Sequence, residues 1–181
     1  DVTCLLHRTT LATNALIEPG GACVASVTTE GFRDILEIAY ERRYSQYDID
    51  LDKPDLIVPR ARCFTARERI SAQGAVIEAL DEAAVDGLVA ALDACKAEAV
   101  AICLLHAYAN PAHEQQVARL IRERFPEKYL SVSSRLLPQV RIYDRVSTTV
   151  LNSYVGPVVA RYLTSLGRRL EELGFVGVLL I

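Results

Sequence analysis

Apolar residues fall along this chain in two patterns, short continuous runs and longer runs with helical spacing. The continuous runs at residues 2–6, 22–28 and 129–133 predict strands. The run at residues 98–105 has no polar face, so we expect it to lie buried on both sides, in the middle of a parallel or mixed sheet.

Helical spacing follows most of these runs. One apolar stripe predicts a helix capped by Asp81, with its buried positions at Val85, Leu88, Val89 and Leu92. Further helices are expected at residues 9–17, 31–38 and 110–126, the last of them begun by an Asn-Pro pair.

The longest periodic segment covers residues 143–173. Its apolar positions recur every four residues, at Val146, Val150, Tyr154, Val158, Tyr162, Leu166 and Leu170. Pro157 lies inside this segment and removes one backbone donor, which predicts a kink. Residues 175–181 predict a further strand, which we expect to begin another domain.

Two segments break the regular alternation. Residues 39–60 are rich in tyrosine and arginine and follow neither period, which predicts a long irregular segment that is either functional or a packed surface connection. Residues 61–70 alternate weakly and predict a strand. A turn at residues 71–74 and a short return strand at residues 75–77 would complete a hairpin.

This order of elements predicts an α/β fold, a mixed sheet with flanking helices. Residues 2–28 are expected to form a βαβ unit. We assign residues 1–142 to one domain and residues 143–181 to a long kinked helix and the first strand of the next. The chain has no methionine and begins and ends inside predicted strands, so we expect an internal piece of a longer polypeptide.

Composition is that of a globular protein with a full core. Of the 181 residues, 51% are hydrophobic and 24% are charged, and the net charge is -3, which gives no electrostatic footprint for nucleic acid. No apolar run reaches the roughly 18 residues that a membrane helix needs. The five cysteines lack paired spacing, which favours reduced, buried thiols in a cytoplasmic protein over disulfides or a metal site.

Hydroxyl and amide side chains gather where the helix at residues 9–17 begins. Thr9, Thr10, Thr13 and Asn14 could hold a phosphate, a carboxylate or a carbonyl there, although these residues alone favour ordinary helix capping. His7 precedes them at the end of a strand, a position that suits acid–base chemistry or hydrogen bonding.

Three further residues are candidates for ligand contact. Arg33 could clamp an anionic group, or it could pair with Asp34 to fix the loop. His106 ends the apolar strand, as His7 does. His113 lies in the first turn of a surface helix and is expected to be solvated. The three histidines lack the spacing of a metal site.

A second polar cluster lies at the start of the long helix. It could line a cleft, or it could pack against residues 39–60, where Arg42 and Arg43 could face a ligand or a partner. The cluster comprises Arg141, Tyr143, Asp144, Arg145, Ser147, Thr148, Thr149 and Asn152. No Walker-type phosphate loop, dinucleotide fingerprint or nucleophile elbow occurs in the chain.

Four ordered stretches resemble the N-terminal region of the hydantoinase/oxoprolinase family: residues 9–16 (TTLATNAL), 29–38 (TEGFRDILEI), 105–111 (LHAYANP) and 147–155 (STTVLNSYV). The resemblance implies an actin-like, ribonuclease-H-related ATPase fold. It also implies an enzyme that uses ATP and Mg²⁺ to phosphorylate the carbonyl oxygen of a cyclic amide, such as a hydantoin or 5-oxoproline, before the ring opens. A ketone carboxylase subunit or a non-catalytic assembly module are the alternatives.

The resemblance also implies partners and roles. A small-molecule substrate and a companion subunit or homo-oligomer are expected, without nucleic acid or membrane. The catalytic residues would be His7, Thr9, Thr10 and Asn14, and the substrate-binding residues Thr13, Arg33, Asp34 and His106. Arg8 stands where the family usually has glycine. The family's glycine-rich phosphate loop is expected before residue 1, so these residues alone are expected to be inactive.

Overall fold

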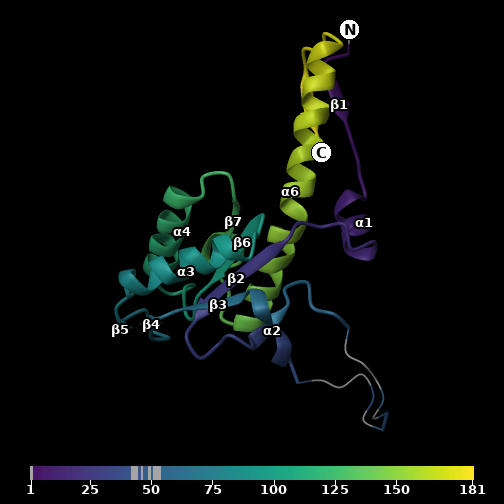
Figure 1. Ribbon diagram of the computed structural model, residues 1–181. Coiled ribbons are helices and arrows are strands. Elements are labelled where there is room, and N and C mark those ends of the chain that lie inside the picture. Colours follow the sequence, from purple (N-terminus) through teal and green to yellow (C-terminus); the bar gives the residue numbers. More distant parts are fainter. Residues whose placement is uncertain (1, 42–44, 46, 49, 51–53) are drawn as a thin grey trace.

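The computed structural model describes residues 2–41, 45, 47–48, 50 and 54–181. A four-stranded sheet forms its centre, in the order β3-β2-β6-β7 (Figure 1). The strands are β2 (Val24–Thr29), β3 (Cys63–Ala66), β6 (Ala99–Cys103) and β7 (Tyr129–Val132), and all neighbours run parallel. Every residue of β6 is buried, which confirms the prediction for the apolar run at residues 98–105.

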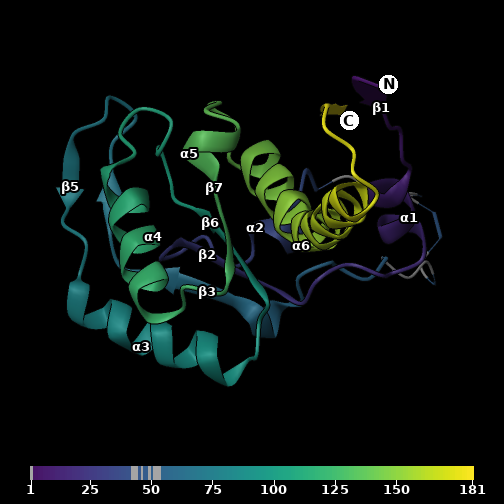
Figure 2. The ribbon, with the colours of Figure 1, turned by 90° about the horizontal axis from the view of Figure 1, so that it is seen from above.

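Helices cover both faces of this sheet, as Figure 2 shows from above. On one face, Val100 and Ile102 of β6 pack with apolar residues of α3 (Glu82–Ala94) and α4 (Ala112–Arg124). On the other face, Ala99 and Ala101 pack with the first half of α6 (Ile142–Glu172). The predicted α/β class with flanking helices is therefore confirmed, and the predicted cap is present, since the Asp81 carboxylate accepts a hydrogen bond from the Ala84 amide.

The segment predicted as one strand over residues 61–70 is divided in the structure. A short 3₁₀ helix, η1 (Arg60–Arg62), leads into β3, and the chain then leaves the sheet at Arg67. β4 (Arg69–Ile70) pairs antiparallel with β5 (Val76–Glu78), which confirms the predicted hairpin. Among the described residues, antiparallel pairing is confined to this hairpin, so the central sheet itself is parallel. The division has a physical reason, because Glu68 turns inward to a buried site described below.

The predicted βαβ unit at residues 2–28 is wrong. β1 (Cys4–Leu6) does not join the central sheet but pairs in parallel with β8 (Val178–Leu180). Both strands lie beside the far half of α6, where α1 (Leu11–Ile17) also packs against the helix (Figure 1). A run of five apolar residues cannot by itself identify its partner strand, and here the partner is about 170 residues away.

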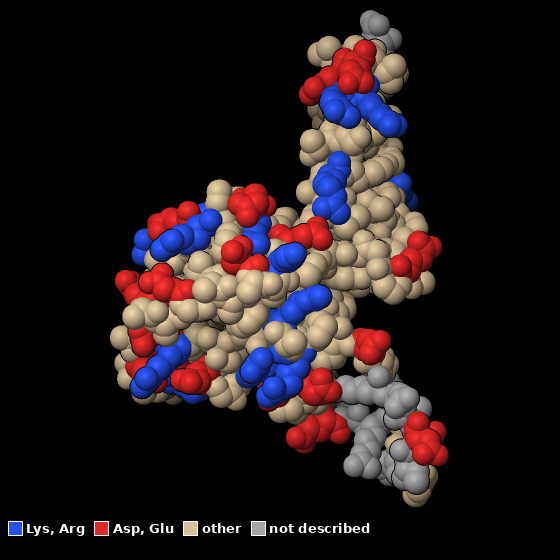
Figure 3. Space-filling view, in the orientation of Figure 1, with Lys and Arg blue, Asp and Glu red and all other residues tan. Residues whose placement is uncertain are grey.

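Helix α6 joins these two regions. It runs for 31 residues, about 46 Å, and the helix continues through Pro157. Its far end carries charges of both signs, visible at the top of Figure 3, where Arg168 and Glu172 pair. Two short helices, α2 (Ile35–Ile38) and α5 (Ser133–Leu136), pack against its first half. The division of the chain after residue 142 stays a prediction.

All five cysteine side chains are free thiols. Burial was correctly predicted for Cys63 and Cys103, but Cys4 is exposed because β1 lies outside the core. Burial raises the pKa of the Cys103 thiol to about 12, so this thiol stays protonated at neutral pH. Within the part of the chain that the structure describes, no helix combines the length and apolarity needed to span a membrane.

Candidate functional site

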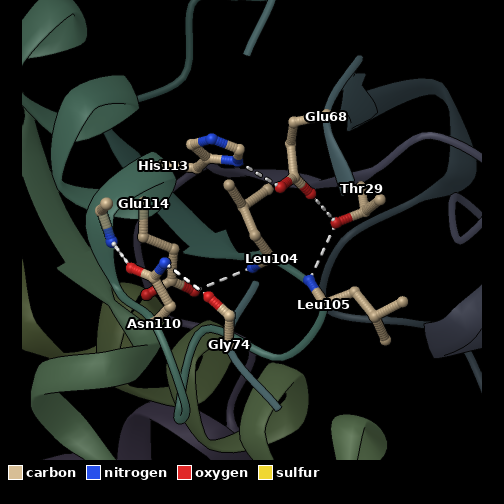
Figure 4. Close-up of polar contacts among 9 residues, drawn as sticks. Thr29, Glu68, Gly74, Leu104, Leu105, Asn110, His113 and Glu114 are labelled. Carbon is tan, nitrogen blue, oxygen red and sulfur yellow. Dashed lines mark hydrogen bonds and ion pairs between the residues drawn. The ribbon is translucent and has the colours of Figure 1, made fainter. Parts of the chain in front are cut away.

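Buried polar side chains gather where the parallel strands of the central sheet end. In open α/β sheets, ligands bind outside this carboxyl edge. Here β2 ends at Thr29, β6 leads into Leu104 and Leu105, and β7 leads into Ser133. We call the buried set at this edge the carboxyl-edge network. It comprises Thr29, Glu68, Leu104, Leu105, His113, Glu114, Ser133 and Arg145, and most of it is drawn in Figure 4.

The first branch of the network runs from α4 to the chain after β6. His113 Nδ1 lies 2.7 Å from Glu68 Oε2, and both side chains are buried. The other Glu68 oxygen accepts a hydrogen bond from the Thr29 hydroxyl. Thr29 Oγ1 in turn accepts the Leu105 amide at 2.8 Å. The branch therefore fixes one backbone amide through three side chains.

The second branch is centred on Glu114, the residue after His113. Its carboxylate accepts hydrogen bonds from the Leu104 amide at 2.8 Å, the Ser133 hydroxyl at 2.6 Å and the Ser134 amide at 2.9 Å. Arg145 of α6 donates to Ser133 Oγ at 3.0 Å and to the Leu104 carbonyl at 2.9 Å. Three elements are thereby tied to the end of β6.

This second branch also balances charge in the interior. Glu114 and Arg145 are both fully buried, and the Ser133 hydroxyl bridges them. A buried charge without a partner is strongly destabilising, whereas an opposite charge and satisfied hydrogen bonds offset its desolvation. The Arg145 guanidinium also lies 5.6 Å from the centre of the Tyr108 ring. Glu114 and Arg145 therefore hold α4, α5 and α6 against the sheet edge.

His106 follows directly after the two anchored amides. Its backbone has a φ of 56°, in the left-handed region, which costs roughly 1–3 kcal/mol for a residue other than glycine. Its ring is half-buried and lies against Tyr108, with 3.4 Å between Nδ1 and the phenol oxygen. Positive φ also occurs at Pro19, Ala39, Glu41 and Lys96. Of these, Lys96 directly follows the end of α3, where this conformation is common. His106 instead lies just beyond a strand.

The structure places His7 and the α1 residues elsewhere. His7 Nε2 lies 2.8 Å from the Tyr162 hydroxyl on the far half of α6. Thr9 Oγ1 accepts the Leu11 amide, so the capping explanation holds for Thr9. Thr10 is the N-cap residue but makes no capping hydrogen bond with its side chain, and Thr13 and Asn14 are exposed.

The structure contradicts the expected ion pair between Arg33 and Asp34. Asp34 instead pairs with Arg60, whose Nε lies 2.5 Å from the carboxylate. The hydrogen bond from Arg60 lowers the pKa of Asp34. Arg33 donates to the Arg60 carbonyl at 3.2 Å. Since Arg60 lies 26 residues along the chain, local spacing could not have identified it.

The predicted site residues do not form one cluster. His106 contacts Tyr108, whose ring also lies against Arg145, whereas His7 contacts Tyr162. Seventeen residues of α6 separate Arg145 from Tyr162, about 25 Å at the helical rise.

His113 is buried, so the prediction of a solvated side chain is wrong. The sequence does contain the signal. His113, Val117 and Ile121 are spaced four apart and share one helix face, and the latter two are core residues. Glu68 carries no such signal, because it lies in the irregular link between β3 and β4.

The polar cluster at the start of α6 packs partly against the described part of residues 39–60. Tyr40 donates to Asp144, and Tyr143 and Ser147 line a pocket of about 330 Å³ together with residues 54–58. Arg145 and Thr149 are buried. The packing alternative is therefore the one observed for Tyr143 and Asp144, whereas Ser147 lines the pocket. Arg42 and Arg43 lie outside the described residues.

The described residues contain no group of three or more His, Cys, Asp or Glu side chains placed to hold a metal ion. The carboxyl-edge network uses its carboxylates on amides, hydroxyls and an imidazole instead. Its chemistry is that of a rigid support, which presents the residues at the surface of the sheet edge.

Comparison with known proteins gives a consistent result. The family model described as hydantoinase/oxoprolinase N-terminal region matches residues 1–125. Caprolactamase subunit alpha of Pseudomonas jessenii is 34% identical over 176 residues, 96% of this chain and 25% of that protein. 5-Oxoprolinase 1 of Arabidopsis thaliana is 31% identical over 189 residues, 94% of this chain and 15% of that protein. The chain thus spans a quarter or less of these relatives.

Solved structures extend the likeness to the fold. The crystal structure of the ATP-dependent caprolactamase from Pseudomonas jessenii matches with a TM-score of 0.88 and 34% identity, over 94% of this chain and 25% of that one. The nucleotide-free structure of acetone carboxylase matches with a TM-score of 0.82 over 92% of this chain and 25% of that one. At 21% identity, the second likeness concerns the fold alone.

Proposed function

Because this chain belongs to the hydantoinase/oxoprolinase family, we propose that it is part of an ATP-dependent enzyme that hydrolyses a cyclic amide. The observation that carries this proposal is the likeness to the ATP-dependent caprolactamase, at 34% identity over nearly the whole chain. The chain covers only a quarter of that protein. The activity is therefore proposed for the whole polypeptide that contains residues 1–181, together with a companion subunit such as the name of caprolactamase subunit alpha implies for that protein.

The chemistry explains why such an enzyme would need ATP. An amide carbonyl in a small ring is a poor electrophile, and its oxygen is a poor leaving group. ATP would supply a phosphoryl group to that oxygen. The phosphorylation would make the carbonyl carbon electrophilic enough for water to attack it. Catalysis of this kind rests mainly on positioning and on stabilisation of charge.

The described residues fit part of this requirement. The hydroxyls of Thr10 and Thr13 and the amide of Asn14 are exposed on one short segment and can donate to a phosphate or carbonyl oxygen. The donors of a Mg²⁺ site are not assembled among the described residues, so we derive no step through this ion. We propose Mg²⁺ and most nucleotide contacts for the rest of the polypeptide.

We propose two separate contact regions within this chain. The α1 region, with His7, Thr9, Thr10, Thr13 and Asn14, would contact the nucleotide. The sheet edge, with Arg33, Asp34 and His106, would contact the substrate. The separation of about 25 Å along α6 favours this division over one shared site.

Replacing Thr10 or Asn14 with alanine is expected to lower kcat/KM about tenfold in the full-length enzyme, because a hydrogen bond to a charged group is lost. Steady-state kinetics of each variant measure this. Thr164→Ala removes the hydroxyl of another exposed threonine, on α6 outside the polar cluster at its start, and is the matched control. Unchanged kcat/KM in both the Thr10 and Asn14 variants would remove the α1 region from the proposal.

The proposed function is tested by ADP release. The full-length protein with its companion subunit is incubated with Mg-ATP and, in separate reactions, caprolactam, hydantoin, 5-oxoproline, or acetone or acetophenone with bicarbonate. Stimulation by a cyclic amide, with the ring-opened product, is the expected result. Stimulation by a ketone with bicarbonate would instead identify a carboxylase. If no compound stimulates ADP release and the protein does not bind ATP, the result would favour a non-catalytic assembly module.

A further inference from the structure

The backbone before His106 is held from two sides by buried side chains. The Leu104 amide donates to Glu114, and the next amide, Leu105, donates to Thr29. Glu114 lies on α4 and Thr29 ends β2, so the two acceptors belong to different elements. The two hydrogen bonds therefore leave the backbone just beyond β6 little freedom to turn.

Both hydrogen bonds depend on neighbouring residues of α4. Glu114 reaches Leu104 directly, whereas His113 reaches Leu105 through Glu68 and Thr29 (Figure 4). The first turn of α4 is itself fixed, since Asn110 accepts from the Ala112 amide and donates to the Gly74 carbonyl at 2.9 Å. The support is thus continuous from the hairpin turn and α4 to the backbone beside His106.

The residue so supported has a strained backbone conformation. His106 has a φ of 56°, lies just beyond the central strand, and keeps a half-buried ring at the sheet edge. Backbone strain persists only where the surroundings over-determine it, and it gathers at functional positions. Here the over-determining groups are visible, and they are buried from water, which would otherwise compete for their hydrogen bonds.

We propose that Thr29, Glu68 and Glu114 are positioning residues, which hold the His106 imidazole toward the substrate. This inference rests on the proposed function, which places the substrate at the sheet edge. These three residues do not touch the substrate themselves. They act through the two amides of Leu104 and Leu105 and so through the direction of the His106 side chain.

Thr29 offers the sharpest test, because its hydroxyl can be removed without changing its shape. Thr29→Val in the full-length enzyme is expected to lower kcat/KM about 10- to 100-fold, the effect of a small misplacement of a reacting group. Thr29→Ser keeps the hydroxyl and is expected to restore most of the activity. Thr28→Val is the matched control, since the buried Thr28 hydroxyl makes no hydrogen bond among the described residues.

A double variant distinguishes positioning from general damage. His106→Asn removes the imidazole, and asparagine tolerates a positive φ. If Thr29 acts through His106, Thr29→Val has little further effect on kcat/KM in the His106→Asn enzyme. An equal fold-loss with and without the imidazole would overturn the proposal.

A second readout does not depend on catalysis. Hydrogen exchange of the peptide that contains residues 104–106 is expected to be faster in Thr29→Val than in Thr28→Val. Equal exchange in the two variants would overturn the positioning role even in an active enzyme. If no substrate stimulates ADP release by the wild-type protein, the proposed function fails, and with it the role toward a substrate, whatever the exchange rates are.

Discussion

Replacing Glu114 with alanine is expected to lower the free energy of unfolding by about 3–5 kcal/mol. The change leaves the Leu104 and Ser134 amides and the Ser133 hydroxyl without their buried acceptor. It also leaves the fully buried guanidinium of Arg145 without an acidic partner. Each unsatisfied buried polar group adds to the loss. Urea unfolding of the full-length polypeptide, followed by hydrogen exchange in peptides from α4 and β6, measures the change.

Glu123→Ala provides the control on the same helix. Glu123 is exposed and forms an ion pair with Arg119, four residues earlier, so its loss is expected to change the free energy of unfolding by no more than about 0.5 kcal/mol. Replacing both Glu114 and Arg145 with leucine is expected to cost less than the sum of the two single changes, because neither charge is then left unpaired. A double-variant loss equal to the sum of the two single losses would contradict the pairing of Glu114 with Arg145 through Ser133.

Replacing Ile102 with alanine is expected to cost about 2–5 kcal/mol. Ile102 lies in the central strand, with β2 on one side and β7 on the other, and its side chain has no exposed surface. Its side chain packs in the core shared with α3 and α4, where Leu92 and Ile121 are fully buried as well. A cavity at this point cannot be filled without moving two helices. Urea unfolding, followed by hydrogen exchange in peptides from β6, measures the loss in the free energy of unfolding.

Ile77→Ala removes the same atoms from the hairpin strand β5, where the isoleucine side chain is 68% exposed. Its expected effect on the free energy of unfolding is within about 0.5 kcal/mol. A loss at Ile102 no larger than the loss at Ile77 would show that β6 is not the centre of a packed core.

The sequence correctly predicted those elements whose apolar pattern follows directly from the surface they bury. The stripe of α3 and the buried run of β6 both follow from burial, so both were located correctly. The site was harder, because its parts are joined across the chain. His113 shares a face with Val117 and could have been identified, whereas the pairing of Glu68 with Thr29 spans 39 residues of chain without a local signal.

The local sequence pattern could not identify the partner of a strand either. The apolar residues of β1 predict a strand, but they suit the edge of any parallel sheet. The pairing of Asp34 with Arg60 shows the same difficulty for charges, since several basic residues of the sequence could have offered the partner. Long-range choices of this kind depend on the completed fold.

The pairing of β1 with β8 sets an order of events during synthesis. Cys4 pairs with Val178, 174 positions later, so at about 5–20 residues per second the first strand waits roughly 10–35 s on the ribosome before its partner is made. The strands and helices between residues 24 and 132 can associate during that time. Until translation has passed β8, β1 lacks this partner strand, and this interval is when the growing chain most needs protection from aggregation.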